Sequence, residues 1–166
     1  RSGLRFVPLS LLVILCNKLD YMIVARFQGV ESVVSYAIAD RIIGIVNAMV
    51  TVLSTTLWPV FAREIDKGNL AWVKATVIKL NLMVVVFYAL FLALLLWKYN
   101  AVVEIWLGRP VHASNAMLSF LTLSSMMLAL ASPYFAIANC LGAVKEQLLS
   151  YLALLAIGLP TKLMAG

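Results

Sequence analysis

Long apolar runs separated by short polar stretches dominate this sequence. They predict membrane-spanning helices at residues 6–27, 33–61, 77–97, 113–141 and 147–166. A helix needs about 20 mostly apolar residues to cross about 30 Å of hydrocarbon, and each run is close to or above this length. We therefore expect an all-α membrane protein, a polytopic transmembrane helix bundle with about five spans.

Composition agrees with this pattern. Of the 166 residues, 64% are hydrophobic and 12% are charged, whereas soluble domains carry about 25% charged residues. A chain this apolar has too few polar groups to cover a water-exposed surface, so lipid must be the solvent for most of it. The chain starts at Arg1 and stops at Gly166 without a polar tail, and we expect a fragment of a single transmembrane domain.

The polar connections predict an orientation. Basic residues favour cytoplasmic loops. If the first helix starts inside, the inner side collects most of the cations, namely Arg1, Arg5, Arg63, Lys67, Lys74, Lys79 and Lys145. The outer side then holds Arg26, Lys98 and Arg109. The charge bias therefore predicts a cytoplasmic start, and it also accounts for the formal charge of +6 without a nucleic-acid partner.

Four charged residues fall well inside the first two predicted spans, away from their ends: Lys18, Asp20, Asp40 and Arg41. Charges within a membrane face the bundle interior, pair with one another or line water. The short turn at residues 28–32 makes the two helices antiparallel neighbours, with all four charges about 11–15 Å from the turn at about 1.5 Å per residue. An Asp20–Arg41 or Lys18–Asp40 contact is therefore expected to be geometrically reasonable.

Three interpretations of these charges stay open. They form a neutral structural ion-pair cluster, or Asp40 and Arg41 lie at the interface because residues 42–62 can span alone. Alternatively, Lys18 and Arg41 offer positive charge to an anionic substrate, while Asp20 and Asp40 orient them or couple transport to ions. The uncharged polar residues of the spans have two interpretations as well, a hydrophilic path or interhelical hydrogen bonds: Asn17, Asn47, Thr51, Ser54, Thr55, Thr56 and Asn81.

Signals of catalysis are missing from the sequence. The single histidine, His112, lies in a predicted outer connection, and no His, Cys and carboxylate cluster has metal-ligand spacing. There is no glycine-rich phosphate loop and no nucleophile–base pair. We therefore predict a protein that is not an enzyme and needs no metal or cofactor.

Three motifs, in this order and spacing, resemble the bacterial polysaccharide-exporter and O-antigen flippases. The first is residues 20–42, DYMIVARFQGVESVVSYAIADRI, in which an acidic residue and an apolar run precede Gly29 and a Tyr-Ala helix ends at a basic residue. The second is residues 57–61, LWPVF, and the third is residues 104–108, EIWLG, in a predicted outer loop. This family belongs to the superfamily that also contains multidrug antiporters and lipid II flippases.

The resemblance implies part of the second six-helix lobe of a twelve-helix transporter in the bacterial inner membrane. The implied activity is flipping of undecaprenyl-pyrophosphate-linked oligosaccharide by alternating access, with proteins of polysaccharide assembly as partners beside the lipid bilayer. Basic cavity residues of the family match Lys18 and Arg41 by position class. A multidrug or cation antiporter using Asp20 and Asp40 is the alternative within transport, and a membrane-embedded glycosyl- or phosphotransferase or polymerase is the alternative from another class.

Overall fold

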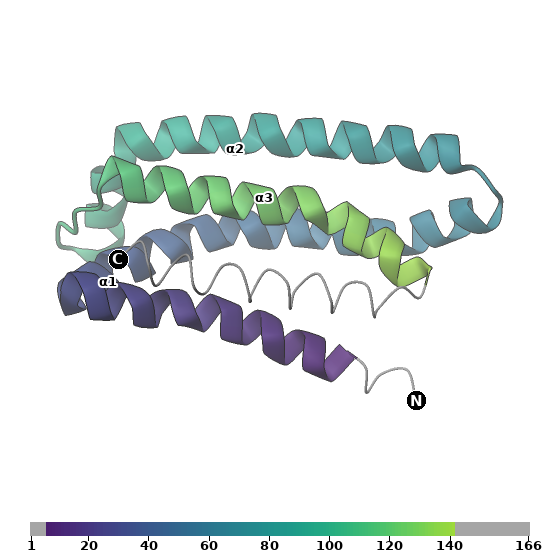
Figure 1. Cartoon of the computed structure of the whole chain (residues 1–166). Coiled ribbons are helices and arrows are strands. Elements are labelled where there is room, and N and C mark those ends of the chain that lie inside the picture. The colour runs from purple at the N-terminus through teal and green to yellow at the C-terminus, as the bar shows by residue number, and fades with distance from the viewer. Residues whose placement is uncertain (1–5, 142–166) are drawn as a thin grey trace.

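The computed structural model describes the backbone of residues 6–141 and, before residue 32, the side chains of Tyr21 and Arg26. This part of the chain is all-helical. It consists of α1 (Phe6–Asp66), α2 (Leu70–Leu107) and α3 (Asn115–Cys140), which run as long rods beside one another (Figure 1). α3 packs against both α1 and α2.

A glycine reverses the direction of the chain within α1. Gly29 has φ 83° and ψ 171°, a backbone region that residues with a side chain avoid. Tyr21, before the glycine, contacts Tyr36 and Asp40, after it. The two halves of α1 are therefore antiparallel (Figure 1), and the predicted short turn at residues 28–32 is confirmed.

Glycines also follow the C-terminal ends of α1 and α2. Gly68, with φ 74°, follows α1, and its amide donates to the carbonyl of Ile65 at 2.9 Å. Gly108 caps α2 in the left-handed conformation and donates to the carbonyl of Glu104 at 2.9 Å. Ser114 begins α3 by accepting a hydrogen bond from the amide of Met117 at 3.2 Å. These caps satisfy backbone groups that the helices leave unpaired at their ends.

Two predicted connections are shorter than expected. We expected a charged link at residues 63–69, but α1 continues to Asp66 and α2 begins at Leu70. We also expected a connection at residues 98–112, but α2 continues to Leu107. Charged residues do not break a helix, and the stretch contains no glycine or proline before Gly108. The EIWLG motif therefore forms the last turn of α2 and its cap rather than an outer loop.

Three helical segments in the described part are long and apolar enough to cross a membrane: Ser32–Asp66, Leu70–Leu107 and Asn115–Cys140. They correspond to the second, third and fourth predicted spans, and this much gives the chain the character of a helical membrane protein. The first predicted span, 6–27, is helical in its backbone, but most of its side chains lie outside the described residues. The fifth, 147–166, lies wholly outside them.

The buried side chains form three clusters along the helices. The first joins α1, α2 and α3 near the Gly108 end and contains Ile38, Ala39, Ile43, Leu95, Tyr99, Val103 and Leu118. The middle cluster contains Val46, Val50, Val84, Tyr88 and Ala129. The third, near the Gly68 end, contains Phe61, Val73, Val77 and Ala136. These clusters fix which residues of neighbouring helices lie at the same height.

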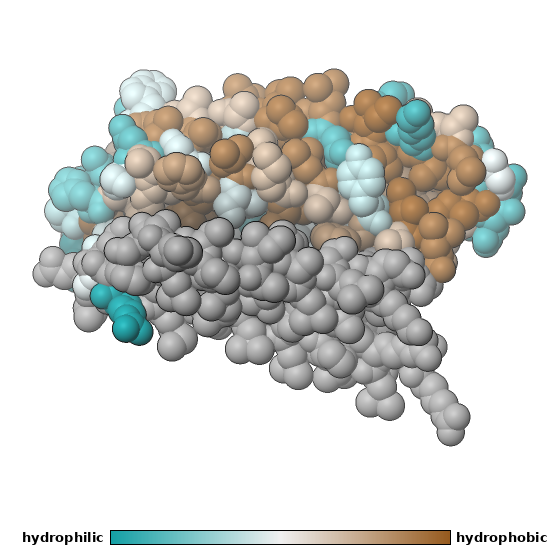
Figure 2. Space-filling view, viewed as in Figure 1, coloured by the Kyte–Doolittle hydropathy of each residue, from teal (hydrophilic) through white to brown (hydrophobic). Residues whose placement is uncertain are grey.

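Large apolar side chains cover much of the outside. Exposed examples on α2 and α3 include Leu82 (64%), Leu90 (67%) and Phe120 (73%). In the space-filling view the hydrophobic residues gather over the middle of the molecule, while hydrophilic residues concentrate towards its two ends (Figure 2). This is the distribution that a bilayer requires, with an apolar band between two polar rims.

Candidate functional site

Asp40 is hydrogen-bonded across the α1 hairpin. The Tyr21 hydroxyl donates to its Oδ2 atom at 2.6 Å, and the Tyr21 ring meets the ring of Tyr36 edge-on, with centroids 5.1 Å apart. The carboxylate is half-buried. Tyr21 is a partner that sequence reasoning missed. A signal was present, because Tyr21 and Asp40 lie 8 and 11 residues from Gly29 along antiparallel helices.

Arg41, the next residue, is exposed. Successive residues of a helix point about 100° apart, so its side chain leaves α1 in a different direction from that of Asp40. In the described part of the chain, the ion pair is Lys67–Glu64 at the other end of the molecule. No described carboxylate therefore forms an ion pair with the Arg41 guanidinium.

The other two candidates are placed only in part. Lys18 and Asp20 belong to the helical first half of α1, but their side chains lie outside the described residues. The predicted Asp20–Arg41 and Lys18–Asp40 contacts therefore stay predictions. What the described residues show is one of the four side chains, Asp40, bonded to a neutral hydroxyl.

The packing of α1 against α2 gives the position of Asp40 and Arg41 along the length of the bundle. Their neighbours Ala39 and Ile43 share a buried cluster with Leu95 and Tyr99 of α2. The pair therefore lies near the end of the uncharged run 80–97, which precedes Lys98. That run is about 27 Å long at about 1.5 Å per residue, close to the thickness of the hydrocarbon.

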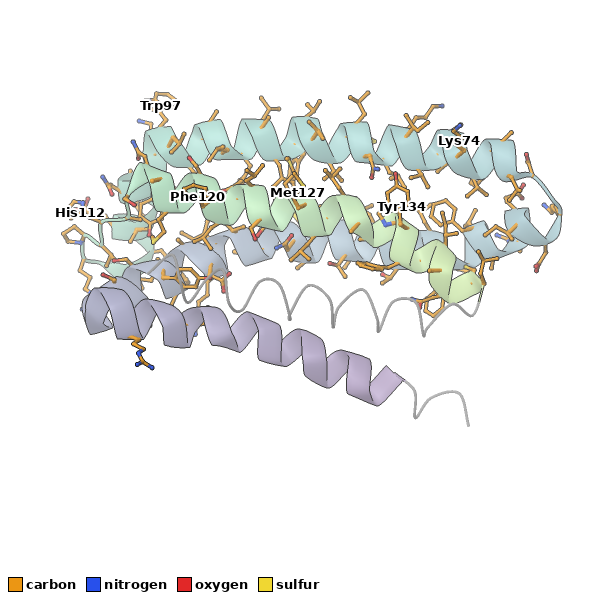
Figure 3. All side chains as sticks on the ribbon, viewed as in Figure 1. Lys74, Trp97, His112, Phe120, Met127 and Tyr134 are labelled. Atoms are coloured by element: carbon orange, nitrogen blue, oxygen red, sulfur yellow. The ribbon has the colours of Figure 1, made fainter. Side chains whose placement is uncertain are left out.

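Lys98 itself looks like a residue of the membrane boundary. Its ammonium lies 4.4 Å from the centroid of the Trp97 ring, and Trp97 points away from the bundle (Figure 3). Tryptophan and lysine at this position are typical of a membrane–water interface. The height of Asp40 and Arg41 therefore favours the interpretation that they lie at the rim, with residues 42–62 crossing the apolar band.

Below Arg41, one face of α1 carries small and hydroxyl side chains. At spacings of three and four residues it presents Gly44, Ala48, Thr51 and Thr55, which places them on a common stripe. Ala48, Thr51 and Thr55 are exposed, and Gly44 is half-buried. The stripe runs from the rim charge into the apolar band.

Other polar residues of the spans tie the helices together. The Tyr88 hydroxyl donates to the Asn47 side-chain oxygen, joining α2 to α1. The hydroxyls of Ser54 and Ser132 share a hydrogen bond that joins α1 to α3. Asn81 donates to the Tyr134 hydroxyl at 3.1 Å and joins α2 to α3. For Asn47, Ser54 and Asn81, the interpretation as interhelical hydrogen bonds is confirmed.

The exposed threonines behave differently. Thr51 donates to the backbone carbonyl of Asn47 at 2.8 Å, and Thr55 to that of Val52 at 2.9 Å. Thr56 donates to the carbonyl of Leu53 at 2.8 Å. These bonds lie within one helix, so the hydroxyl oxygens keep free acceptor capacity. Of the polar residues named in the sequence whose side chains are described, the threonines therefore remain able to line a hydrophilic path. The side chain of Asn17 lies outside the described residues.

The described residues contain no cluster of metal-ligand side chains. Within residues 6–141, as far as their side chains are described, no three His, Cys, Asp or Glu residues group as metal ligands would. His112 is exposed on the connection between α2 and α3, away from the helix bundle (Figure 3).

Comparison of the chain with protein-family models, with curated proteins and with solved structures finds no match.

Proposed function

We propose that this chain is part of a transporter that flips an anionic lipid-linked substrate, an undecaprenyl-pyrophosphate-linked oligosaccharide, across a bacterial inner membrane. In this proposal the chain belongs to the second lobe of a twelve-helix flippase that works by alternating access. The observation that carries the proposal is the exposed Arg41 at the head of the Gly44–Ala48–Thr51–Thr55 stripe.

The positive charge of Arg41 supports the proposal of an anionic substrate. Asp40 lies beside Arg41 in sequence, but its carboxylate is engaged by the Tyr21 hydroxyl. The guanidinium therefore keeps a positive charge that no described carboxylate pairs. An arginine can bind two phosphate oxygens at once, and such bonds are stronger than bonds between neutral groups. Arg41 thus provides what a pyrophosphate needs when it leaves water.

The stripe below Arg41 supports passage of a hydrophilic group. Glycine and alanine leave room along the helix, and Thr51 and Thr55 offer oxygen atoms within the apolar band. A sugar moving past needs hydrogen-bond partners at each depth, because an unpaired polar group in hydrocarbon costs several kcal/mol. The lipid tail of the same substrate would stay in the bilayer throughout.

Deleting the gene in its host tests the function. We expect loss of a surface polysaccharide and accumulation of its lipid-linked repeat unit on the inner leaflet, both reversed by complementation. Normal polysaccharide combined with altered tolerance to cationic drugs would overturn the proposal in favour of a multidrug antiporter. Normal levels of lipid-linked unit with a missing glycosidic linkage would instead indicate a transferase or polymerase.

Substitutions in the complementing gene test the site. Arg41→Gln and Lys18→Gln should each lower export at equal protein level, and Arg41→Lys should retain more export than Arg41→Gln because it keeps the charge. Arg63→Gln is the matched control, since Arg63 is also exposed on α1 but at the opposite end of the span. Equal export by Arg41→Gln and Arg63→Gln would refute a role for Arg41.

A further inference from the structure

Two of the long helices contain a proline in their interior. Pro59 lies in α1 and Pro133 in α3. Proline has no backbone N–H, so it cannot donate to the carbonyl four residues before it, and its ring crowds that carbonyl. The turns that end at Pro59 and Pro133 therefore each lack a helical hydrogen bond, to the carbonyls of Thr55 and Ala129. Sharp bends in long helices are found at such turns.

Threonine side chains weaken the same stretch of α1 further. The Thr55 hydroxyl donates to the carbonyl of Val52 at 2.9 Å, and the Thr56 hydroxyl to that of Leu53 at 2.8 Å. Bonds of this kind compete with the hydrogen bonds of the backbone and often bend helices. By contrast, α2 has no glycine or proline within residues 70–107 and runs as one straight rod (Figure 1). The helices that can bend are therefore α1 and α3.

A hydrogen bond joins α1 to α3 beside both weakened turns. The hydroxyls of Ser54 and Ser132 share it. Ser132 directly precedes Pro133 in α3, and in α1 the next proline follows Ser54 by five residues. The second half of α1 and α3 run in the same direction (Figure 1). Both prolines therefore lie on the Gly68 side of this bond.

Beyond the prolines, the last turns of α1 and α3 pack against each other. Phe61 of α1 is fully buried and shares the third cluster with Ala136 of α3. The Cys140 thiol donates to the backbone carbonyl of Trp58, with 3.7 Å between sulfur and oxygen. These contacts join the two helix ends into one unit.

Two kinds of contact hold this unit against α2. Val73 and Val77 of α2 complete the third cluster, and apolar contacts of this kind have no fixed direction, so they allow sliding. The Asn81 amide donates to the Tyr134 hydroxyl at 3.1 Å, directly after Pro133 in α3. Tyr134 is 55% exposed, so this bond lies at the surface of the bundle and can break without opening the core.

We propose that the last turns of α1 and α3, beyond their prolines, swing as one unit about the Ser54–Ser132 hydrogen bond. The Asn81–Tyr134 hydrogen bond is the latch that holds the unit against α2. The swing opens and closes the bundle at its Gly68 end. It follows from the helices alone and is independent of the substrate proposed above.

The length of the unit sets the size of the movement. Leu141, at the end of α3, lies eight residues beyond Pro133, which is about 12 Å at about 1.5 Å per residue. A change in bend of about 20°, the scale of a proline kink, displaces that end by about 4 Å. A displacement of this size is measurable between two spin labels.

The test measures spin-label distances in the intact protein in lipid nanodiscs by double electron–electron resonance, with Cys16 and Cys140 replaced by serine. One label replaces Leu90, which is exposed on α2. The second label replaces either Leu141, beyond the hinge, or Phe120, which is exposed on α3 before the hinge. We call these the hinge pair and the control pair. We expect the distance distribution of the hinge pair to be about 4 Å wider than that of the control pair.

Three variants separate the hinge from the latch. Pro59→Ala combined with Pro133→Ala restores both helical hydrogen bonds and should narrow the hinge-pair distribution to the width of the control pair. Tyr134→Phe removes the latch and should shift the hinge-pair distribution by about 4 Å, towards the swung position. Pro110→Ala is the matched control, because Pro110 lies in the connection between α2 and α3, and it should change neither pair.

An unchanged control pair shows that a variant has kept its fold. A hinge-pair distribution as narrow as the control pair in the wild type and in Tyr134→Phe would overturn the proposal. Equal width in the wild type and the double proline variant would also overturn it. So would equal broadening of both pairs, because the movement would then not be localised at the prolines.

Discussion

Replacing Tyr88 with phenylalanine should loosen the packing of α1 against α2. Tyr88 is 1% exposed and lies in the middle buried cluster, and its hydroxyl donates to the Asn47 side chain. Tyr88→Phe keeps the ring and removes only this bond. Hydrogen bonds between membrane helices contribute about 0.6 kcal/mol on average and about 1.7 kcal/mol at most. Because Asn47 is left with an unpaired acceptor inside the bundle, we expect a loss towards the upper value.

Reversible unfolding in mixed micelles of increasing sodium dodecyl sulfate, followed by circular dichroism, measures this free energy. A double-mutant cycle with Asn47→Ala isolates the pair from the separate effects of each change. Thr55→Val is the control, because the Thr55 hydroxyl bonds to its own helix, and it should change stability by less than about 0.5 kcal/mol. A coupling energy near zero, or an equal loss in Thr55→Val, would refute the view that Asn47 and Tyr88 join the helices.

Three further changes test other features. Gly29→Ala should lower the unfolding free energy in the same assay by about 1–3 kcal/mol, because φ 83° and ψ 171° suit only glycine. The space around Gly29 is open, so the loss would come from the backbone and not from a clash. An unchanged midpoint would mean that the turn adopts another conformation. Phe61→Ala should lower the unfolding free energy by about 3 kcal/mol or more, since Phe61 is fully buried. Phe120→Ala is the control and should lower it little, because Phe120 is 73% exposed. Similar losses in the two variants would place Phe61 outside the core. Tyr21→Phe removes the hydrogen bond to the Asp40 carboxylate. We expect lower export in the complementation assay, because an unengaged carboxylate beside Arg41 weakens the attraction of this region for an anionic substrate. Export equal to wild type would show that the Tyr21 bond does not matter for transport.

The sequence predicts the repeating helical pattern well because each helix carries its own signal. Apolar runs of sufficient length predicted the helices found at Ser32–Asp66, Leu70–Leu107 and Asn115–Cys140, and Gly29 with its polar neighbours predicted the reversal of α1. The ends of α2 were less predictable. Lys98 and Glu104 indicated the edge of the membrane, and we took that edge for the end of the helix. A helix stops where its backbone bonds stop, which at Gly108 is well past the apolar band.

The position of Asp40 and Arg41 relative to the membrane stayed open in the sequence for a different reason, with an interface position as one of its interpretations. Counting from the turn at Gly29 assumes that the turn lies at the membrane surface, and on that assumption the pair is buried in hydrocarbon. Their position depends instead on the register between helices, which is set by packing such as the buried cluster that Ala39 and Ile43 share with Leu95 and Tyr99. That register puts Arg41 near the end of the uncharged run that precedes Lys98, and the Gly29 turn lies about 18 Å beyond Arg41, at about 1.5 Å per residue.

This register changes the role that we propose for Arg41. An arginine in mid-membrane costs about 2.5–3.5 kcal/mol or more and needs a partner inside the bundle. At the rim, Arg41 would meet headgroups and water, and it could remain exposed without a carboxylate of its own. In the proposed transport cycle, its place would then change from a site halfway across the membrane to one at the mouth, where a pyrophosphate would first leave or last re-enter water. The threonines below it, rather than the arginine, would accompany the sugar through the apolar band.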